Sequence, residues 1–291
     1  MTADTVPPDR TIGGDPGLYG PSSEAWRLNR EAMLLLGAGP RALLLQIAHP
    51  SVAAGVNDHS DFRADPWRRL RNTLESFLTI VYGPTATARA EIRRLNALHR
   101  GIVGAGYQAR DPELSRWVHA TLVDSTIVAN DAWLGPIPRS RQAAFYEETR
   151  PIGRAFGVPE AMLPADLDAF DAYVAGMLAA DGAVQVGPLA RELAGVILHP
   201  PLPGPLGTLP VPPGCYDWVM WPSIGLLPGA VRAAYGFPWG PAHELVAAWL
   251  VAGWRAWRPL LPAGFRQMPQ ALAADRRMLG GPGPTSEGDA P

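Results

Sequence analysis

The chain has 291 residues, of which 47% are hydrophobic and 18% charged, and its formal net charge is −2. This length can bury one large core or two closely packed ones. The composition argues against a disordered chain, and the near-neutral charge argues against a nucleic-acid-binding surface. All 25 basic residues are arginine, which excludes a lysine Schiff base and a P-loop lysine.

The cysteine content and the length of the apolar runs further limit the kinds of protein that this chain can be. Cys215 is the single cysteine, so the chain can form neither an intrachain disulfide nor a cysteine-cluster metal site, and we expect a cytoplasmic location. The N-terminus is polar and lacks the apolar core of a signal peptide. The longest apolar stretches, 34–45 and 245–257, are shorter than the roughly 20 residues that span a bilayer. We therefore expect no integral membrane segment.

The organisation of the chain follows from its proline-rich and glycine-rich segments. Residues 1–23 predict a flexible arm, and residues 261–291 predict a C-terminal helix followed by a disordered tail. Between them, 24–260 predicts one helical domain. The proline-dense connector 199–215 cannot form regular helix, and it separates a larger N-terminal bundle from a smaller C-terminal unit that could share its core.

Helical periodicity dominates, and strand-like alternation never exceeds about four residues. Asp65 and Asp111 each precede a proline, which marks a capped helix start. We therefore predict an all-α, multi-helix bundle with helices over 24–37, 40–56, 65–81, 85–104, 111–133, 139–156, 165–180, 187–198, 222–235, 241–258 and 267–279.

Four of the six histidines lie between residues 37 and 125, among these apolar helical runs: His49, His59, His99 and His119. Imidazole is the commonest protein ligand for a metal or a haem iron. The ordinary alternative is a core histidine hydrogen-bonded to a backbone carbonyl, and it applies to His99 and to His119 alike. His49 precedes a proline, so we expect it at the end or kink of a helix, where its ring can cap free carbonyls. For His119, nearby Asp124 is a candidate partner.

The helix predicted over 65–81 carries a polar pair on one face, because Arg69 and Thr73 are four residues apart. An arginine facing inward on this leucine-rich helix needs an anionic partner. The alternative is that Arg68, Arg69 and Arg71 form a solvated stripe, and spacing alone leaves both open.

Several common sites have no support in the sequence. There is no HExxH and no histidine pair at i, i+4 spacing, so a zinc site of that kind is not predicted. The GAGPRA run at 37–42 follows a helix and lacks the third glycine of a dinucleotide-binding turn. No GxSxG anchors a serine hydrolase mechanism.

The order of the remaining motifs is more specific than any one of them. They are LLLQIAHP, AAGV, HSDF, DPWRRLRNT, VYGP, LHRGIVG, YQARDPELSRWVHATLVDS and FYEETRPIGRAFGVPEAMLP. In this order they resemble the rubber oxygenase catalytic-domain family, which includes the latex clearing protein and the mycophenolic-acid-pathway oxygenase. The resemblance covers about 24–260 and is strongest over 37–178.

The resemblance implies an all-helical fold that encloses one haem b. The family's RxxxT pattern falls on Arg69 and Thr73, and its iron-ligating histidine falls on His99, with His119 as the competing ligand. Arg69 is then expected to contact a haem propionate, and Thr73 with His49 or His59 to form polar contacts on the open face of the iron. The chain departs from the rubber-cleaving pattern, because Asn72 stands beside Thr73, no lysine exists to act as a second ligand, and the upstream run offers no carboxylate base.

These departures argue against rubber as the substrate. The resemblance implies a haem-dependent oxygenase that uses dioxygen or peroxide on a small hydrophobic substrate, such as an isoprenoid or a secondary metabolite. Two alternatives stay open: a non-catalytic haem carrier or redox sensor, and a cofactor-free helical binding module. The oligomeric state does not follow from the sequence.

Overall fold

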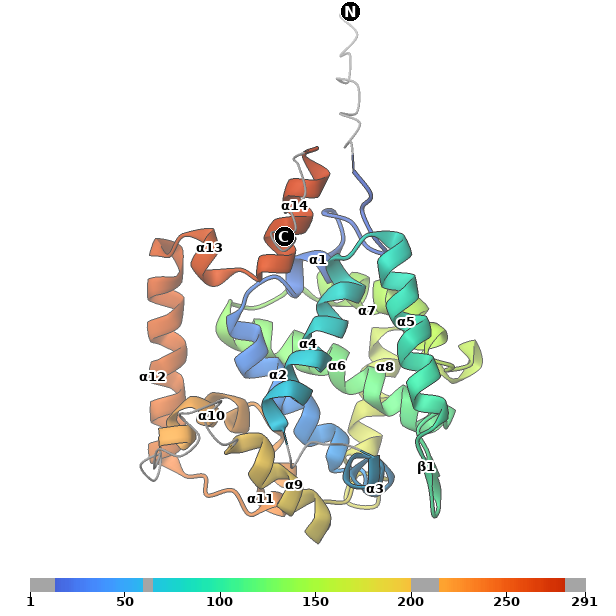
Figure 1. Ribbon diagram of the computed structural model, residues 1–291. Coiled ribbons are helices and arrows are strands. Elements are labelled where there is room, and N and C mark those ends of the chain that lie inside the picture. Colours follow the sequence, from blue (N-terminus) through green and yellow to red (C-terminus); the bar gives the residue numbers. More distant parts are fainter. Residues whose placement is uncertain (1–13, 60–64, 200–214, 281–291) are drawn as a thin grey trace, which may run out of the picture.

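The computed structural model describes residues 14–59, 65–199 and 215–280, and this part of the chain is almost entirely helical (Figure 1). The predicted all-α fold class is confirmed. The α-helices are α1 Glu24–Leu28, α2 Met33–Ile47, α3 Pro50–His59, α4 Pro66–Tyr82, α5 Thr85–Arg100, α6 Pro112–Trp133, α7 Arg139–Ala155, α8 Leu167–Met177, α9 Pro188–Leu198, α10 Cys215–Gly225, α11 Gly229–Tyr235, α12 Pro241–Trp257, α13 Ala263–Arg266 and α14 Pro269–Met278.

Helix starts that carry a side-chain cap lie where the sequence predicts them. The Asp65 carboxylate accepts a hydrogen bond from the Arg68 amide at 2.9 Å, and helix α4 begins at the next residue. Asp111 caps α6 in the same way through the amide of Glu113 at 2.8 Å. In both helices a proline follows the cap, where its missing N–H costs nothing.

The N-terminal helices divide differently from the prediction. The predicted helices 24–37 and 40–56 are instead three, because the chain leaves the helix after α1, and α2 then runs unbroken through Pro40. A proline inside a helix removes one hydrogen bond, and here the packing of α2 in the core offsets that loss. The end or kink expected at His49 is confirmed, since α2 ends at Ile47 and α3 begins at Pro50.

Two further predictions need correction. The helix predicted to run to residue 104 ends at Arg100, and a short antiparallel hairpin follows, made of β1 Val103–Gly104 and β2 Tyr107–Gln108. Gly106, at φ 80°, allows the tight turn between them. The helix predicted over 222–235 is instead parts of two helices, because α10 ends at Gly225 and Pro228 is the N-cap of α11.

Helices α2 and α6 pack against each other through the middle of the molecule, and the main core surrounds them (Figure 1). The indole N–H of Trp117 donates to the carbonyl of Leu45 at 3.1 Å, and the hydroxyl of Tyr235 donates to the carbonyl of Leu44 at 2.6 Å. Because Tyr235 lies beyond the predicted connector and Leu44 lies before it, helices on both sides of that segment share this core. The connector residues 200–214 lie outside the described part of the chain, as do residues 1–13 of the predicted arm and 281–291 of the predicted tail.

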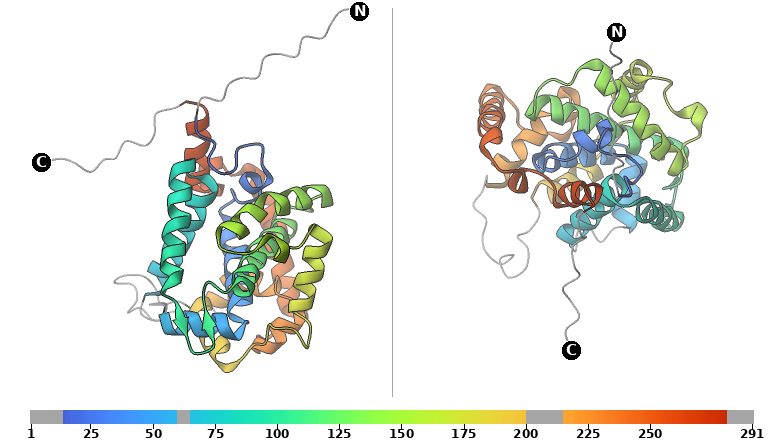
Figure 2. Two further views of the ribbon diagram at one scale, coloured as in Figure 1. Left: turned by 90° about the vertical axis from the view of Figure 1, so that its right-hand side faces the viewer. Right: turned by 90° about the horizontal axis from the view of Figure 1, so that it is seen from above.

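Helices α4 and α5 form an antiparallel pair along one side of the molecule (Figure 2). The last turns of α4 pack against α1 and the C-terminal helix α14 in a second core cluster. Its buried members are Trp26, Leu78, Val81, Tyr82, Met268, Ala271, Ala274 and Met278. The first turn of α4 and the last turn of α5 lie at the other end of the pair, and they carry Arg69 and His99.

Candidate functional site at the open end of the α4–α5 pair

Arg69 differs from its two neighbouring arginines in its contacts. The guanidinium of Arg68 pairs with Asp65 at 3.5 Å, and that of Arg71 pairs with Glu75 at 3.9 Å. The Arg69 guanidinium has no hydrogen bond or ion pair with any described residue. All three side chains are exposed to solvent, so the expectation of an inward Arg69 paired with an anion is not met within the described chain.

Neighbouring protein atoms nevertheless exclude part of the water around Arg69. Desolvation by these surroundings lowers the pKa of Arg69, although its side chain is open to solvent. The guanidinium is therefore partly desolvated by neighbouring atoms while it stays accessible to solvent. One turn further along α4, the Thr73 hydroxyl donates to the carbonyl of Arg69 at 2.9 Å.

His99, in the last turn of α5, lies within electrostatic reach of Arg69. Its pKa is lowered, first by burial and second by the positive charge of Arg69. The half-buried ring is 6.5 Å from that of Phe156, which follows α7, and neither ring nitrogen is hydrogen-bonded to a described residue. The lowered pKa favours the neutral imidazole, in which one nitrogen carries a lone pair that can bind a ligand and the other carries an N–H that can donate a hydrogen bond.

His119 has a different environment on α6. Its Nε2–H donates to the carbonyl of Thr149 on α7 at 3.0 Å, and the side chain is 9% exposed. Burial lowers the pKa of His119 to about 4, against a smaller opposing effect of the Thr149 hydrogen bond. The other ring nitrogen faces Gly153, where an added Cβ would lie 3.5 Å away. The expected partner Asp124 was wrong, because its carboxylate pairs with Arg41 at 2.6 Å.

His49 and His59 lie at the two ends of α3. The Nδ1 of His49 accepts the amide of Ser51 at 3.3 Å, so the ring caps the start of α3 and not the free carbonyls at the end of α2 as expected. Burial lowers its pKa. His59 is exposed, and its Nε2 bonds to the Val103 carbonyl of the β-hairpin at 3.1 Å. No contact between described residues joins either ring to Arg69 or His99.

The residues at this end of the pair fit the haem that the resemblance implies. A haem needs an unprotonated imidazole for iron, a cation for its propionates, and apolar walls. His99 and Arg69 supply the first two. Leu70 and Leu98, which are 42% and 48% exposed, supply apolar surface on the same two helix ends. The structure adds Phe156, which helical periodicity did not single out although it lies within the FGVPEAMLP motif.

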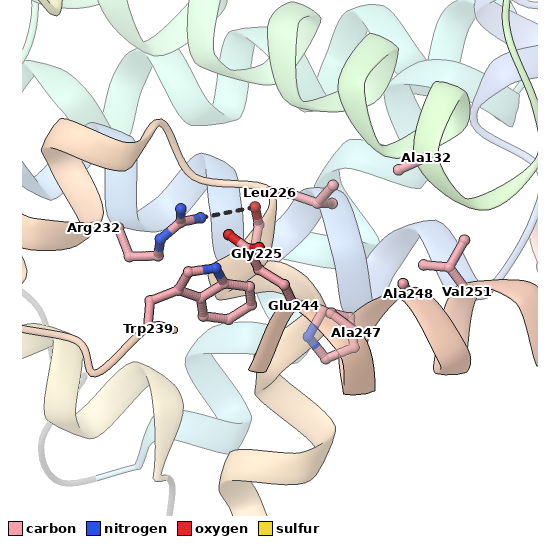
Figure 3. A pocket seen from close by; sticks show the side chains of 10 residues that line it. Ala132, Gly225, Leu226, Arg232, Trp239, Glu244, Ala247, Ala248 and Val251 are labelled. Atoms are coloured by element: carbon pink, nitrogen blue, oxygen red, sulfur yellow. Dashed lines mark hydrogen bonds between the residues drawn. The ribbon is translucent and has the colours of Figure 1, made fainter. Parts of the chain in front are cut away.

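Two pockets lie away from these residues. One, of about 390 Å³, follows the α4–α5 pair beyond Thr73 and is lined by Asn72, Glu75, Ser76, Thr79, Glu91 and Arg94. The other, of about 370 Å³, lies between α10, α11 and α12, with Trp239 and Arg232 at one end and Ala132 and Val251 at the other (Figure 3). No sequence motif indicated the second pocket. The described residues contain no group of three or more histidine, cysteine, aspartate or glutamate side chains placed to hold a metal ion.

Comparison with known proteins identifies relatives but no structural precedent. The uncharacterized protein Rv2237 of Mycobacterium tuberculosis and the uncharacterized protein Mb2261 of Mycobacterium bovis are each 29% identical to this chain over 230 residues, which is 76% of this chain and 87% of theirs. No solved structure matches the chain significantly. Among the described residues, no helix is long and apolar enough to cross a membrane.

The family profile described as "ER-bound oxygenase mpaB/B'/Rubber oxygenase, catalytic domain" matches residues 26–258. The match contains Arg69, Thr73 and every histidine of the chain. It covers most of the described helices, from α1 to the end of α12. The chain belongs to this family of oxygenase catalytic domains.

Proposed function

We propose that the protein is a haem b-dependent oxygenase that acts on a small hydrophobic substrate with dioxygen or peroxide. The observation that carries the proposal is that His99, in the last turn of α5, lies within electrostatic reach of Arg69, in the first turn of α4. These two side chains are a neutral imidazole and a guanidinium, and each lacks a hydrogen-bond partner among the described residues.

His99 is the proposed iron ligand, and its burial favours the unprotonated ring that iron binds. Ligation requires the neutral ring, and the lowered pKa of His99 favours that form. His119 is the weaker candidate, because its side chain is only 9% exposed and its remaining nitrogen, Nδ1, faces Gly153 of α7.

Arg69 is the proposed partner of a haem propionate. A guanidinium can hold a carboxylate through two parallel hydrogen bonds, and the contact is stronger than one between neutral groups. The bond from the Thr73 hydroxyl to the Arg69 carbonyl holds this turn of α4 in place. Haem iron supplies the redox chemistry of oxygen activation, and the protein supplies binding and orientation.

Two features bear on the substrate that we propose: exposed apolar side chains near Arg69 and His99, and the absence of lysine from the sequence. Leu70 and Leu98 offer apolar contacts next to Arg69 and His99, which suits an isoprenoid or a similar secondary metabolite. Because the chain has no lysine, a lysine could not serve as a second ligand if haem iron is bound. We further propose that His49 and His59 contribute polar contacts to the substrate, through the imidazole nitrogens not used at the ends of α3.

A visible spectrum tests the cofactor and its ligand together. Protein purified from cells supplied with iron and haem precursor should show a Soret band. His99→Ala should abolish or strongly shift that band while the far-ultraviolet circular dichroism stays unchanged. His119→Ala should keep the band but lower the melting temperature, since it removes a buried hydrogen bond. A colourless protein that takes up no added haemin would overturn the haem assignment, and loss of the band in His119→Ala alone would move the ligand to α6.

A further inference from the structure

One hydrogen bond joins helix α5 to helix α7 in the part of the chain that the structure describes. The side-chain Nδ2 of Asn96, on α5, donates to the carbonyl of Ala155, the last residue of α7, at 2.8 Å. No ion pair links the two helices within the described residues. Asn96 is therefore the polar contact that relates the His99 end of α5 to the end of α7.

Asn96 and His99 lie on the same face of α5, because they are three residues apart. Both side chains are half-buried, whereas Ala97 and Leu98 between them are exposed. His99 turns toward α7 as well, since its ring centroid lies 6.5 Å from that of Phe156, which follows the last residue of this helix. The two side chains thus contact two consecutive residues at the end of α7.

The backbone turn that ends α7 fixes the chain on both sides of Phe156. Gly157 has φ 91°, a left-handed conformation that favours glycine, and its amide donates to the carbonyl of Arg154 at 2.9 Å. The amide of Val158 donates to the carbonyl of Gly153 at 3.1 Å, and the Val158 side chain is buried. Such a glycine turn with a buried residue after it is a common way to end a helix.

The carbonyl of Ala155 receives its hydrogen bond from outside this turn. No described backbone amide donates to it, as is usual for the last carbonyls of a helix, so the side-chain amide of Asn96 is its partner. This carbonyl belongs to the peptide unit that joins Ala155 to Phe156. Loss of the Asn96 bond would therefore release Phe156 from its place beside His99.

The imidazole of His99 depends on packing for its orientation, because neither of its nitrogens is hydrogen-bonded to a described residue. Residues around a metal ligand orient it, and their loss weakens metal binding. We propose that Asn96 is a positioning residue, which holds the Ala155 carbonyl and thereby keeps the ring of Phe156 against the imidazole of His99. The consequence for iron binding rests on the proposed function, whereas the contact between the two rings does not.

Asn96→Asp tests the proposal in the full-length chain, because it keeps the shape of the side chain and removes the N–H donor. Ala97→Asp is the matched control, since it adds the same charge at the next, exposed position. In nuclear magnetic resonance spectra at about pH 8.5, where histidine is ordinarily neutral, the Cε1–H resonance of His99 is the one of six that His99→Gln removes. Phe156→Leu should shift this resonance, because it removes the neighbouring ring. Asn96→Asp should shift it in the same direction and leave the other histidine resonances in place, which shows an intact fold, and Ala97→Asp should leave all of them in place.

Titration with haemin measures the consequence for the proposed iron site. Asn96→Asp should raise the haemin dissociation constant about tenfold, and Ala97→Asp should leave it unchanged. The proposal is overturned by a His99 resonance that stays unshifted in Phe156→Leu or Asn96→Asp, by an equal shift in Ala97→Asp, or by a haemin dissociation constant that Asn96→Asp leaves unchanged. An unmodified protein that binds no haemin would overturn the proposed function instead, and the resonances would still decide whether Asn96 positions His99.

Discussion

Three arginines in the first two turns of α4 are all exposed but differ in their partners. Arg68 pairs with the N-cap Asp65 and Arg71 with Glu75 of the same helix, whereas Arg69 has no partner among the described residues. Pairs of the first kind on a helix surface contribute little to stability. The one guanidinium left unpaired beside His99 is therefore the one that can bind an anionic ligand.

Arg69→Ala is expected to weaken haem retention about tenfold or more, because it removes a charge-assisted contact of roughly 1.5–3 kcal/mol. Arg68→Ala is the matched control and should retain haem as the unmodified protein does. The measurement is the rate of haem transfer to an excess of apomyoglobin, followed at the Soret band. Equal transfer rates for the two variants would mean that the arginines form a solvated stripe and that Arg69 has no role in haem binding.

His119 should make stability depend on pH. Its pKa is about 4 in the folded protein, against an ordinary value of 6.5. Between pH 4 and 6.5 the imidazole is therefore mostly protonated in the unfolded chain and mostly neutral in the folded chain. The stability contributed by neutral, buried His119 is complete above pH 6.5 and is lost as the pH falls to about 4. The loss reaches about 3 kcal/mol at most.

Urea unfolding at several pH values measures this effect. The free energy of unfolding of His119→Gln should fall less steeply between pH 6.5 and 4 than that of the unmodified protein, since glutamine does not titrate. His59→Gln, at an exposed histidine, should follow the unmodified protein. Parallel curves for the unmodified protein and His119→Gln would contradict a neutral, buried His119.

The sequence could not separate His99 from His119 on its own. Both lie on helices with apolar periodicity, and that periodicity reports only the face on which a side chain stands. The difference arises from α7, which brings the carbonyl of Thr149 to His119 and the ring of Phe156 to His99. Thr149 is 30 residues from His119 along the chain, so no local pattern contains the contact.

At the scale of helices, a buried arginine joins three elements. Arg41 on α2 is 3% exposed, and its guanidinium donates to the Asp124 carboxylate and the Ser125 hydroxyl on α6 at 2.6 and 2.8 Å. Its Nε donates to the carbonyl of Leu226, after α10, at 2.8 Å. Because α2 and α6 form the centre of the core, this one side chain fixes how the C-terminal helices meet them.

Arg41→Ala is expected to lower the free energy of unfolding by about 3–5 kcal/mol, because it leaves the Asp124 carboxylate without its partner near the core. Arg139→Ala removes an exposed arginine that pairs with Asp168 and Asp171, and it should cost less than about 1 kcal/mol. Chemical unfolding of both variants measures the difference. Similar losses would show that Arg41 contributes no more than a surface pair.

The helix boundaries that the sequence predicted well are those with a local chemical cause. Asp65 and Asp111 place an acceptor and a proline at a helix start, and both starts lie where expected. Pro40 gave the opposite result, because burial of α2 in the core outweighs the hydrogen bond that this proline removes. The hairpin after α5 was missed because two-residue strands are too short to show alternation.

At the scale of the whole molecule, the core extends beyond the segment that the oxygenase family shares. The family match ends at residue 258, but α14 follows it and packs on α4, the helix that begins with the Arg69 turn. The segment leading to α14 is also anchored near α1. Arg258 and Arg266 both pair with Glu31, which is 3% exposed, and the amide of Met268 donates to the carbonyl of Arg30 at 2.8 Å.

A chain ending at Pro262 should therefore be much less stable than one ending at Gly280. The shorter chain loses the buried side chains of Met268 and Met278 and exposes Trp26 and Tyr82, which cover the other side of the same cluster. Burying each such large side chain contributes roughly 1.5–3 kcal/mol, so the loss should be at least about 5 kcal/mol, comparable to the whole stability of many domains. Thermal unfolding of the two truncated chains measures it, and the chain ending at Gly280 should melt with the full-length protein because it keeps all of α14. If the chain ending at Pro262 melted at the same temperature as the chain ending at Gly280, α14 would be an appendage and α4 would hold its place through α1 and α5 alone.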